Sequence, residues 1–74
     1  MPSKYPVLRP SEVESGLQEF GYWRVSQKGS HIKYTNGSQI TVVPNHREIA
    51  KGTLKGILEK ADIDLDDFMD AIQK

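Results

Sequence analysis

Residues 22–43 read YWRVSQKGSHIKYTNGSQITVV, and this stretch predicts three antiparallel strands. Aromatic and β-branched residues, which favour strands, occur throughout three segments: residues 22–28, 31–35 and 39–43. Gly29-Ser30 separates the first two segments as a tight turn, and Asn36-Gly37 separates the second from the third. Asn-Gly is a strong signal for a hairpin turn because both positions accept a positive φ. We therefore expect an antiparallel meander.

A helix should precede this sheet. Ser11 and Glu14 form the Ser-x-x-Glu pattern of a capping box, which predicts a helix that starts at Ser11. Apolar residues then follow at helical spacing: Val13, Leu17 and Phe20. Gly21 should end this helix, because glycine tolerates a positive φ.

Two more helices should follow the sheet. After a polar loop at residues 45–52, Thr53 can cap a helix that carries an apolar stripe: Leu54, Ile57, Leu58 and Ala61. Asp64 can cap a short last helix with its own apolar residues: Leu65, Phe68, Met69 and Ile72.

The order helix, three strands, helix, short helix predicts an α+β protein with two layers. Three short strands need a partner that covers one face, and the helices can supply it, which leaves the other face open to solvent or a ligand. A chain of 74 residues fits one domain. We expect an extended arm at residues 1–10, which hold three prolines, and a single domain at residues 11–74.

The composition excludes several classes of site. The chain has no cysteine, which removes disulfides, thiolate nucleophiles and cysteine-based zinc sites and fits a reducing cytoplasm. No apolar run approaches the roughly 20 residues of a membrane helix, and residues 1–9 lack the apolar segment of a signal peptide. His31 and His46 are too few ligands for a metal site, so we expect no metal and no cofactor.

Charge is unevenly distributed although the chain is neutral overall. Residues 1–56 carry eight cations and four carboxylates, a net charge of +4, whereas residues 57–74 carry a net charge of −4. A neutral protein of this kind can present a basic face to a polyanion, or simply an ordinary mixed surface.

The second strand holds the most informative pattern. Side chains alternate between faces along a strand, so His31 and Lys33 should share one face, and Ile32 and Tyr34 should pack under the helices. Lys28 can reach the same open face across the turn. An imidazole beside two cations suits proton transfer at a phosphodiester, and turn N–H groups can bind phosphate oxygens. Equally, a strand histidine is often a surface residue without a task.

Two further side chains have open roles. His46 is either a second proton carrier or a polar loop residue. Trp23 is either a core residue or an exposed surface on which a base stacks. Its strand parity is opposite to that of Tyr22, so we favour Tyr22 in the core and Trp23 partly exposed.

Several stretches resemble the HicA family of toxins from toxin–antitoxin modules, also described as YcfA-like. They follow one another with matching order and spacing across roughly residues 11–70: Gly21-Tyr22, QKGSHIKY at 27–34, TVVPNH at 41–46, KGTLKGIL at 51–58 and DDF at 66–68. One departure is Asp62, which stands where a helix-ending glycine is common and should therefore be left-handed.

The resemblance implies a fold like that of double-stranded-RNA-binding domains and an mRNA interferase, a metal-independent endoribonuclease that blocks translation. The family's catalytic histidine follows Gly-Ser, which makes His31 the catalytic residue here. We expect the RNA to be bound by its neighbours and by one lysine of the loop after the sheet: Lys28, Gly29, Ser30, Lys33 and Lys51. The implied partners are mRNA and a HicB-type antitoxin that covers the active surface.

Two rival functions remain open at this point. The same fold could be a non-catalytic RNA-binding module, since fold does not determine function. It could also be a protein-interaction domain in which His31 is idle.

Overall fold

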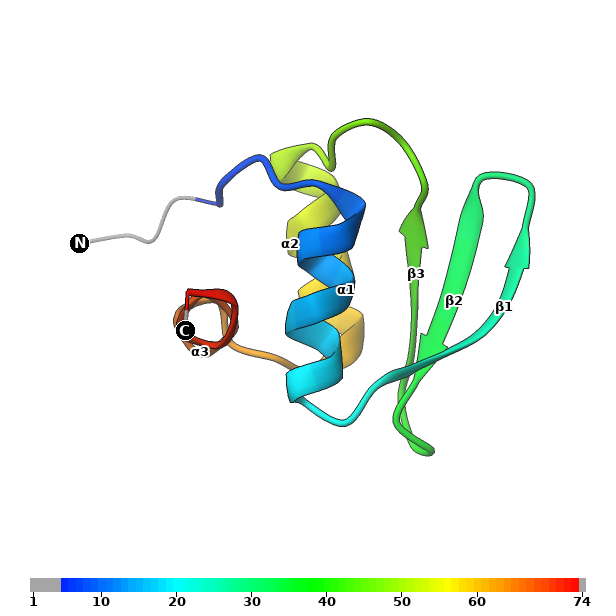
Figure 1. Ribbon diagram of the computed structural model, residues 1–74. Helices are drawn as coiled ribbons and strands as arrows, with labels where there is room; N and C mark the ends of the chain where they lie inside the picture. The colour runs from blue at the N-terminus through cyan, green and yellow to red at the C-terminus, as the bar shows by residue number, and fades with distance from the viewer. Residues whose placement is uncertain (1–4, 74) are drawn as a thin grey trace.

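The computed structural model describes residues 5–73, which form three helices and one three-stranded antiparallel sheet (Figure 1). The elements follow in this order: α1 (Pro10–Glu19), β1 (Trp23–Lys28), β2 (His31–Thr35), β3 (Ile40–Pro44), α2 (Lys51–Ala61) and α3 (Leu65–Ile72). The sheet order is β1-β2-β3. The expected α+β class and the order helix, sheet, helix, short helix are confirmed.

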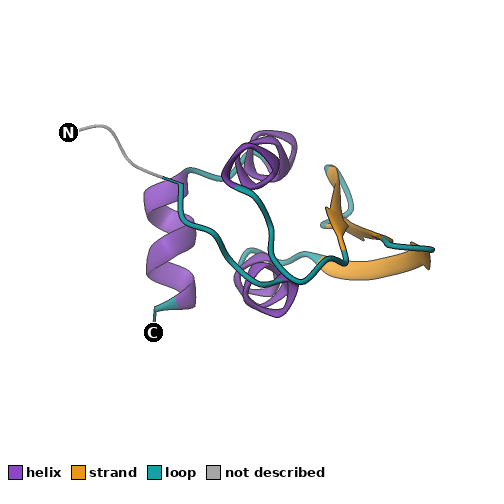
Figure 2. Ribbon diagram, turned by 90° about the horizontal axis from the view of Figure 1, so that it is seen from above, coloured by secondary structure: helices purple, strands orange, loops and turns teal. Residues whose placement is uncertain are grey.

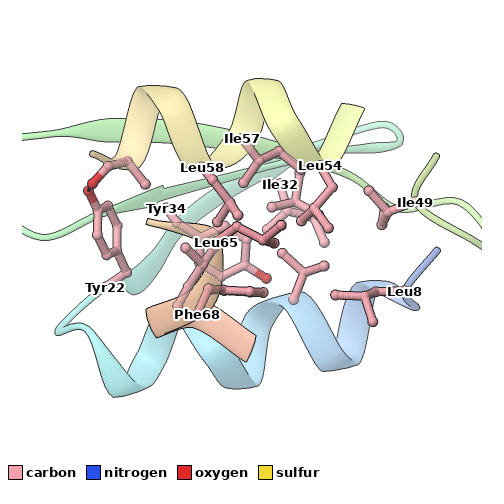
Figure 3. Close-up of a cluster of buried hydrophobic side chains, with 14 residues drawn as sticks. Leu8, Tyr22, Ile32, Tyr34, Ile49, Leu54, Ile57, Leu58, Leu65 and Phe68 are labelled. Carbon is pink, nitrogen blue, oxygen red and sulfur yellow. Dashed lines mark hydrogen bonds between the residues drawn. The ribbon is translucent and has the colours of Figure 1, made fainter. Parts of the chain in front are cut away.

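The helices all lie on one side of the sheet. Seen from above, α1 and α2 run side by side next to the sheet, and α3 packs on the side of this helix pair that faces away from the sheet (Figure 2). Apolar side chains from the sheet and all three helices meet between these layers, as Figure 3 shows. The opposite face of the sheet carries no layer from residues 5–73.

Glycine makes the close approach of α3 to α1 possible. A Cβ built on Gly16 would lie 2.4 Å from Cε1 of Phe68 and 2.7 Å from Cγ2 of Ile72. Both Gly16 and Phe68 are buried. A side chain at position 16 would therefore push α3 away from α1.

Two buried hydroxyls tie α2 to the rest of the protein. The Tyr22 hydroxyl donates to the carbonyl oxygen of Ala61 at 2.7 Å, and the Thr41 hydroxyl donates to that of Ile57 at 3.0 Å. Tyr22 is buried just before β1, and Trp23 is exposed, as the strand parity predicted. Thr41 is fully buried, a position that its polar character did not suggest.

The register differs from the expected one at the second turn. Thr35 pairs with Ile40, so the β2–β3 connection has four residues and the strand covers 40–44 instead of 39–43. The Asn36 side-chain oxygen accepts hydrogen bonds from the N–H groups of Ser38 and Gln39, and only Gly37 has a positive φ in this turn. The expectation of a tight turn with a positive φ at both Asn36 and Gly37 is wrong, because the Asn36 side chain organises a wider loop.

Both predicted starts of the longer helices are wrong. α1 begins with Pro10 at its first position, and the Glu12 carboxylate accepts a hydrogen bond from the Arg9 N–H at 2.8 Å, so Ser11 is not the cap. α2 begins at Lys51, which places Thr53 inside the helix. By contrast, Asp64 caps α3 by accepting from the Asp66 N–H at 3.1 Å, as predicted.

A short pairing between distant segments explains the early start of α2. Leu8 and Ile49 form an isolated antiparallel bridge, and both side chains are buried. The expected arm at residues 1–10 thus contributes Leu8 to the core, while its residues 1–4 lie outside the described part of the chain. This bridge fixes the backbone directly before the helix, which continues from Ala50.

Asp62 ends α2 in the left-handed conformation, with φ 58° and ψ 46°, as expected. The first hairpin is also as predicted, since Lys28 pairs with His31 across Gly29 and Ser30. β1 contains an irregularity between Arg24 and Ser26, which leaves Val25 without a partner in β2.

Candidate active site on the open face of the sheet

The alternation of β2 places the candidate catalytic residue on the uncovered face. Ile32 and Tyr34 are 3% and 1% exposed, and His31 and Lys33 are both exposed. The separation follows from the strand geometry, in which neighbouring side chains point to opposite faces. His31 therefore lies where a solvent-borne ligand can reach its imidazole.

This imidazole lines a shallow depression of about 290 Å³ together with two lysine side chains. The depression is lined by residues from all three strands: Ser26, Gln27, Lys28, His31, Lys33 and Val42. The register explains the grouping, because Lys28 pairs with His31 and Lys33 pairs with both Ser26 and Val42. The structure thus brings together three of the predicted site residues, Lys28, His31 and Lys33.

The other predicted site residues lie outside the lining of this depression. Gly29, with φ 59°, and Ser30 form the exposed turn that joins Lys28 to His31. The carbonyl oxygen of Ser30 accepts a hydrogen bond from the Asn45 N–H, so the turn is held against the end of β3. Lys51 is exposed at the first residue of α2, in the helix layer.

Sequence reasoning missed Ser26, Gln27 and Val42 as part of the site. Ser26 and Val42 could have been found only from the cross-strand register, because each pairs with Lys33. The bulge at Val25 changes which residues of β1 face the open side of the sheet. Strict alternation of side chains along the sequence does not predict this change.

An ion pair connects the sheet to α1 on the covered face. The Nη2 atom of Arg24 in β1 lies 3.1 Å from the Oε2 atom of Glu14 in α1. Burial raises the pKa of the Tyr34 hydroxyl to about 12, and hydrogen bonding to Glu14 acts in the same direction. These groups join α1 to the sheet on the face opposite to His31.

Within residues 5–73, no group of three or more histidine, cysteine, aspartate or glutamate side chains is placed to hold a metal ion. None of the helices in this range is both long and apolar enough to cross a membrane.

These features define a small α+β domain that presents a histidine between two lysines on an uncovered sheet. A family model described as the HicA toxin of bacterial toxin–antitoxin systems matches residues 10–63, from the first residue of α1 to just beyond α2. The chain belongs to the HicA toxin family. A comparison with individually curated proteins gives no match. Membership identifies a toxin of a toxin–antitoxin system and implies an antitoxin partner.

Proposed function

We propose that this toxin is an endoribonuclease that cleaves mRNA and so inhibits translation, with His31 as its general acid or base. The observation that supports this most is the exposed His31 side chain, which lines one depression with Lys28 and Lys33 on the uncovered face of the sheet. A polyanionic strand can approach this face without displacing any part of residues 5–73.

The chemistry needs little from the protein because RNA carries its own nucleophile. The imidazole of His31 takes the proton of a 2′-hydroxyl, and the 2′-oxygen attacks the adjacent phosphorus. The bond between phosphorus and the 5′-oxygen breaks, and the leaving oxygen receives a proton from imidazolium or water. The products are a 2′,3′-cyclic phosphate and a 5′-hydroxyl, and this route uses no metal.

The neighbouring cations and turn amides act on the phosphate. The ammonium groups of Lys28 and Lys33 stabilise the negative charge that grows on the phosphate oxygens in the transition state. The N–H groups of Gly29 and Ser30 are donors to the same oxygens, as in other anion-binding turns. Lys51, in the helix layer, contacts the RNA backbone away from the reacting bond.

The test compares the purified wild type with His31→Ala on a defined RNA in the presence of a chelator. A positioned acid or base contributes about 10²–10⁴-fold, so His31→Ala should lose cleavage by that factor. His31 is exposed, so the variant should keep the thermal midpoint of the wild type. Mass spectrometry of the products should detect the cyclic phosphate.

His46→Ala is the matched variant for this test, because it removes an exposed imidazole from the loop after β3. Retained cleavage would assign His46 to the polar loop, and an equal loss would assign it as the second proton carrier. If the wild type and His31→Ala bind RNA equally and neither cleaves it, the result would favour a non-catalytic RNA-binding module. Equal growth arrest by the wild type and His31→Ala would make His31 idle.

We propose a HicB-type antitoxin as the partner, seated on the same open face. The support is that this is the sheet face without a covering layer among residues 5–73. Addition of the antitoxin should stop cleavage and protect His31 from acylation by diethyl pyrocarbonate. Full inhibition with an unprotected imidazole would contradict this placement.

A further inference from the structure

The open face of the sheet continues well beyond the depression at His31. The strand register divides this face into three cross-strand rows. These rows are Lys28–His31–Pro44, Ser26–Lys33–Val42 and Trp23–Thr35–Ile40. The first row contains the proposed catalytic residue, the second contains a cation, and the third is largely apolar.

Trp23 gives the third row an exposed aromatic surface. Its side chain is 53% exposed, and its row partner Ile40 is 54% exposed. A Cβ built on Gly37 would lie 3.8 Å from the Cη2 atom of Trp23, so the tip of the indole lies near the β2–β3 turn. About half of the side chain faces solvent.

The spacing of the rows relates this surface to the proposed cleavage site. Thr35 lies four residue steps along β2 from His31, which is about 13 Å at the usual rise of a strand. Lys33 lies midway between them on the same face. A strand of RNA with its reacting phosphate at His31 would pass Lys33 and bring a nearby nucleotide to the third row.

The chemistry of the third row fits an unpaired base. Flat aromatic rings bind bases by stacking, and this works only where a base is free of its own helix. Lys33 offers a cation to a phosphate, and Trp23 beyond it offers a ring to a base. This order matches the alternation of phosphates and bases along a single strand of RNA.

We propose that Trp23 is a base-stacking platform that positions single-stranded RNA on the open face. This inference rests on the proposed ribonuclease function and specifies its substrate as an unpaired segment. The ring acts as a positioning group, and the chemical step remains with His31.

Trp23 is the single tryptophan of the chain, so its own fluorescence reports on its surroundings. In a His31→Ala background, titration with a short single-stranded oligoribonucleotide of mixed sequence should quench this fluorescence. The same strand annealed to its complement should quench it much less.

Affinity is then measured with a labelled form of the same strand. Trp23→Ala should weaken binding about 5- to 150-fold, the range expected for one lost base stack. Trp23→Phe should restore most of the affinity because it keeps an aromatic face. Val7→Ala is the matched control, since Val7 is also an exposed apolar residue but lies outside the sheet. It should bind as the parent does.

Cleavage separates this inference from the function on which it rests. With His31 present, Trp23→Ala should raise KM more than it lowers kcat. If Trp23→Ala leaves KM and RNA affinity unchanged, the base-stacking platform is overturned, even where the wild type cuts RNA. If Trp23→Ala weakens only the binding of the antitoxin, the third row belongs to the interface with that partner protein. Trp23-dependent binding in a protein that does not cut RNA would keep the platform and reject the nuclease.

Discussion

The two faces of the sheet give adjacent residues of β2 opposite surroundings. Ile32 and Tyr34 are sealed under α1 and α2, whereas His31 and Lys33, one residue away, face solvent. The covered face therefore supplies stability, and the open face carries the proposed chemistry. Substitutions on each face should change one property and leave the other nearly intact. Stability is best measured in a His31→Ala background, which the proposed function predicts to be free of toxicity.

The largest expected effect is on the covered face. Ile32→Ala should lower the free energy of unfolding by about 2–5 kcal/mol, because it removes buried methyl groups and leaves a cavity. Urea denaturation followed by circular dichroism measures this loss. A change below about 1 kcal/mol would mean that this face is not sealed.

High pH provides the next test. Burial holds the pKa of Tyr34 at about 12, above the ordinary value of 10, so the folded state retains a proton that the unfolded state releases. The contribution of Tyr34 to stability should be constant below pH 10 and should fall between pH 10 and pH 12, by up to about 2–3 kcal/mol. Burial also raises the pKa of Tyr22, which adds to the fall.

Tyr34→Phe isolates the part that belongs to Tyr34. The stability of this variant should depend less on pH above pH 10 than that of the parent protein. Parallel pH profiles for the two proteins would show that the Tyr34 hydroxyl is not sealed beneath the helices.

The packing of α3 extends the comparison to the outer side of the helices. Gly16→Ala should lower the free energy of unfolding by roughly 1–2 kcal/mol, because the new methyl group overlaps Phe68 by more than helix propensity offsets. Gly56→Ala in α2 is the matched control, since its Cβ meets nothing within 4 Å. It should stabilise the protein by about 0.5–1 kcal/mol. The reverse order in thermal melts would contradict the observed α1–α3 contact.

The smallest expected effect on stability is on the open face. Lys33→Ala should change the free energy of unfolding by less than about 0.5 kcal/mol. In the protein with His31, it should slow cleavage about tenfold or less, because a phosphate contact is easier to replace than a proton carrier. A loss equal to that of His31→Ala would reverse the assigned roles.

Local patterns in the sequence predicted the division between these faces. The alternation along β2 predicted the faces of His31 and Ile32 correctly, because neighbouring side chains of a strand point to opposite faces. The cap at Asp64 and the left-handed Asp62 were also predictable, since both depend on local backbone conformation.

The features that sequence reasoning missed depend on distant contacts. The bridge between Leu8 and Ile49 joins segments far apart in the chain and sets the start of α2. Thr41 is buried because a carbonyl of α2 accepts its hydroxyl proton. In the site, Ser26 and Val42 become neighbours of Lys33 only once the strand register is known.

The exposure of β1 has a consequence for local opening of the protein. Every residue of β1 is exposed and the strand is at the edge of the sheet, whereas β2 is held by a strand on either side. Amide hydrogens of β1 should therefore exchange with solvent faster than those of β2. The imidazole thus belongs to the firmly held strand, and Lys28 and Trp23 belong to the strand for which local opening should cost less free energy.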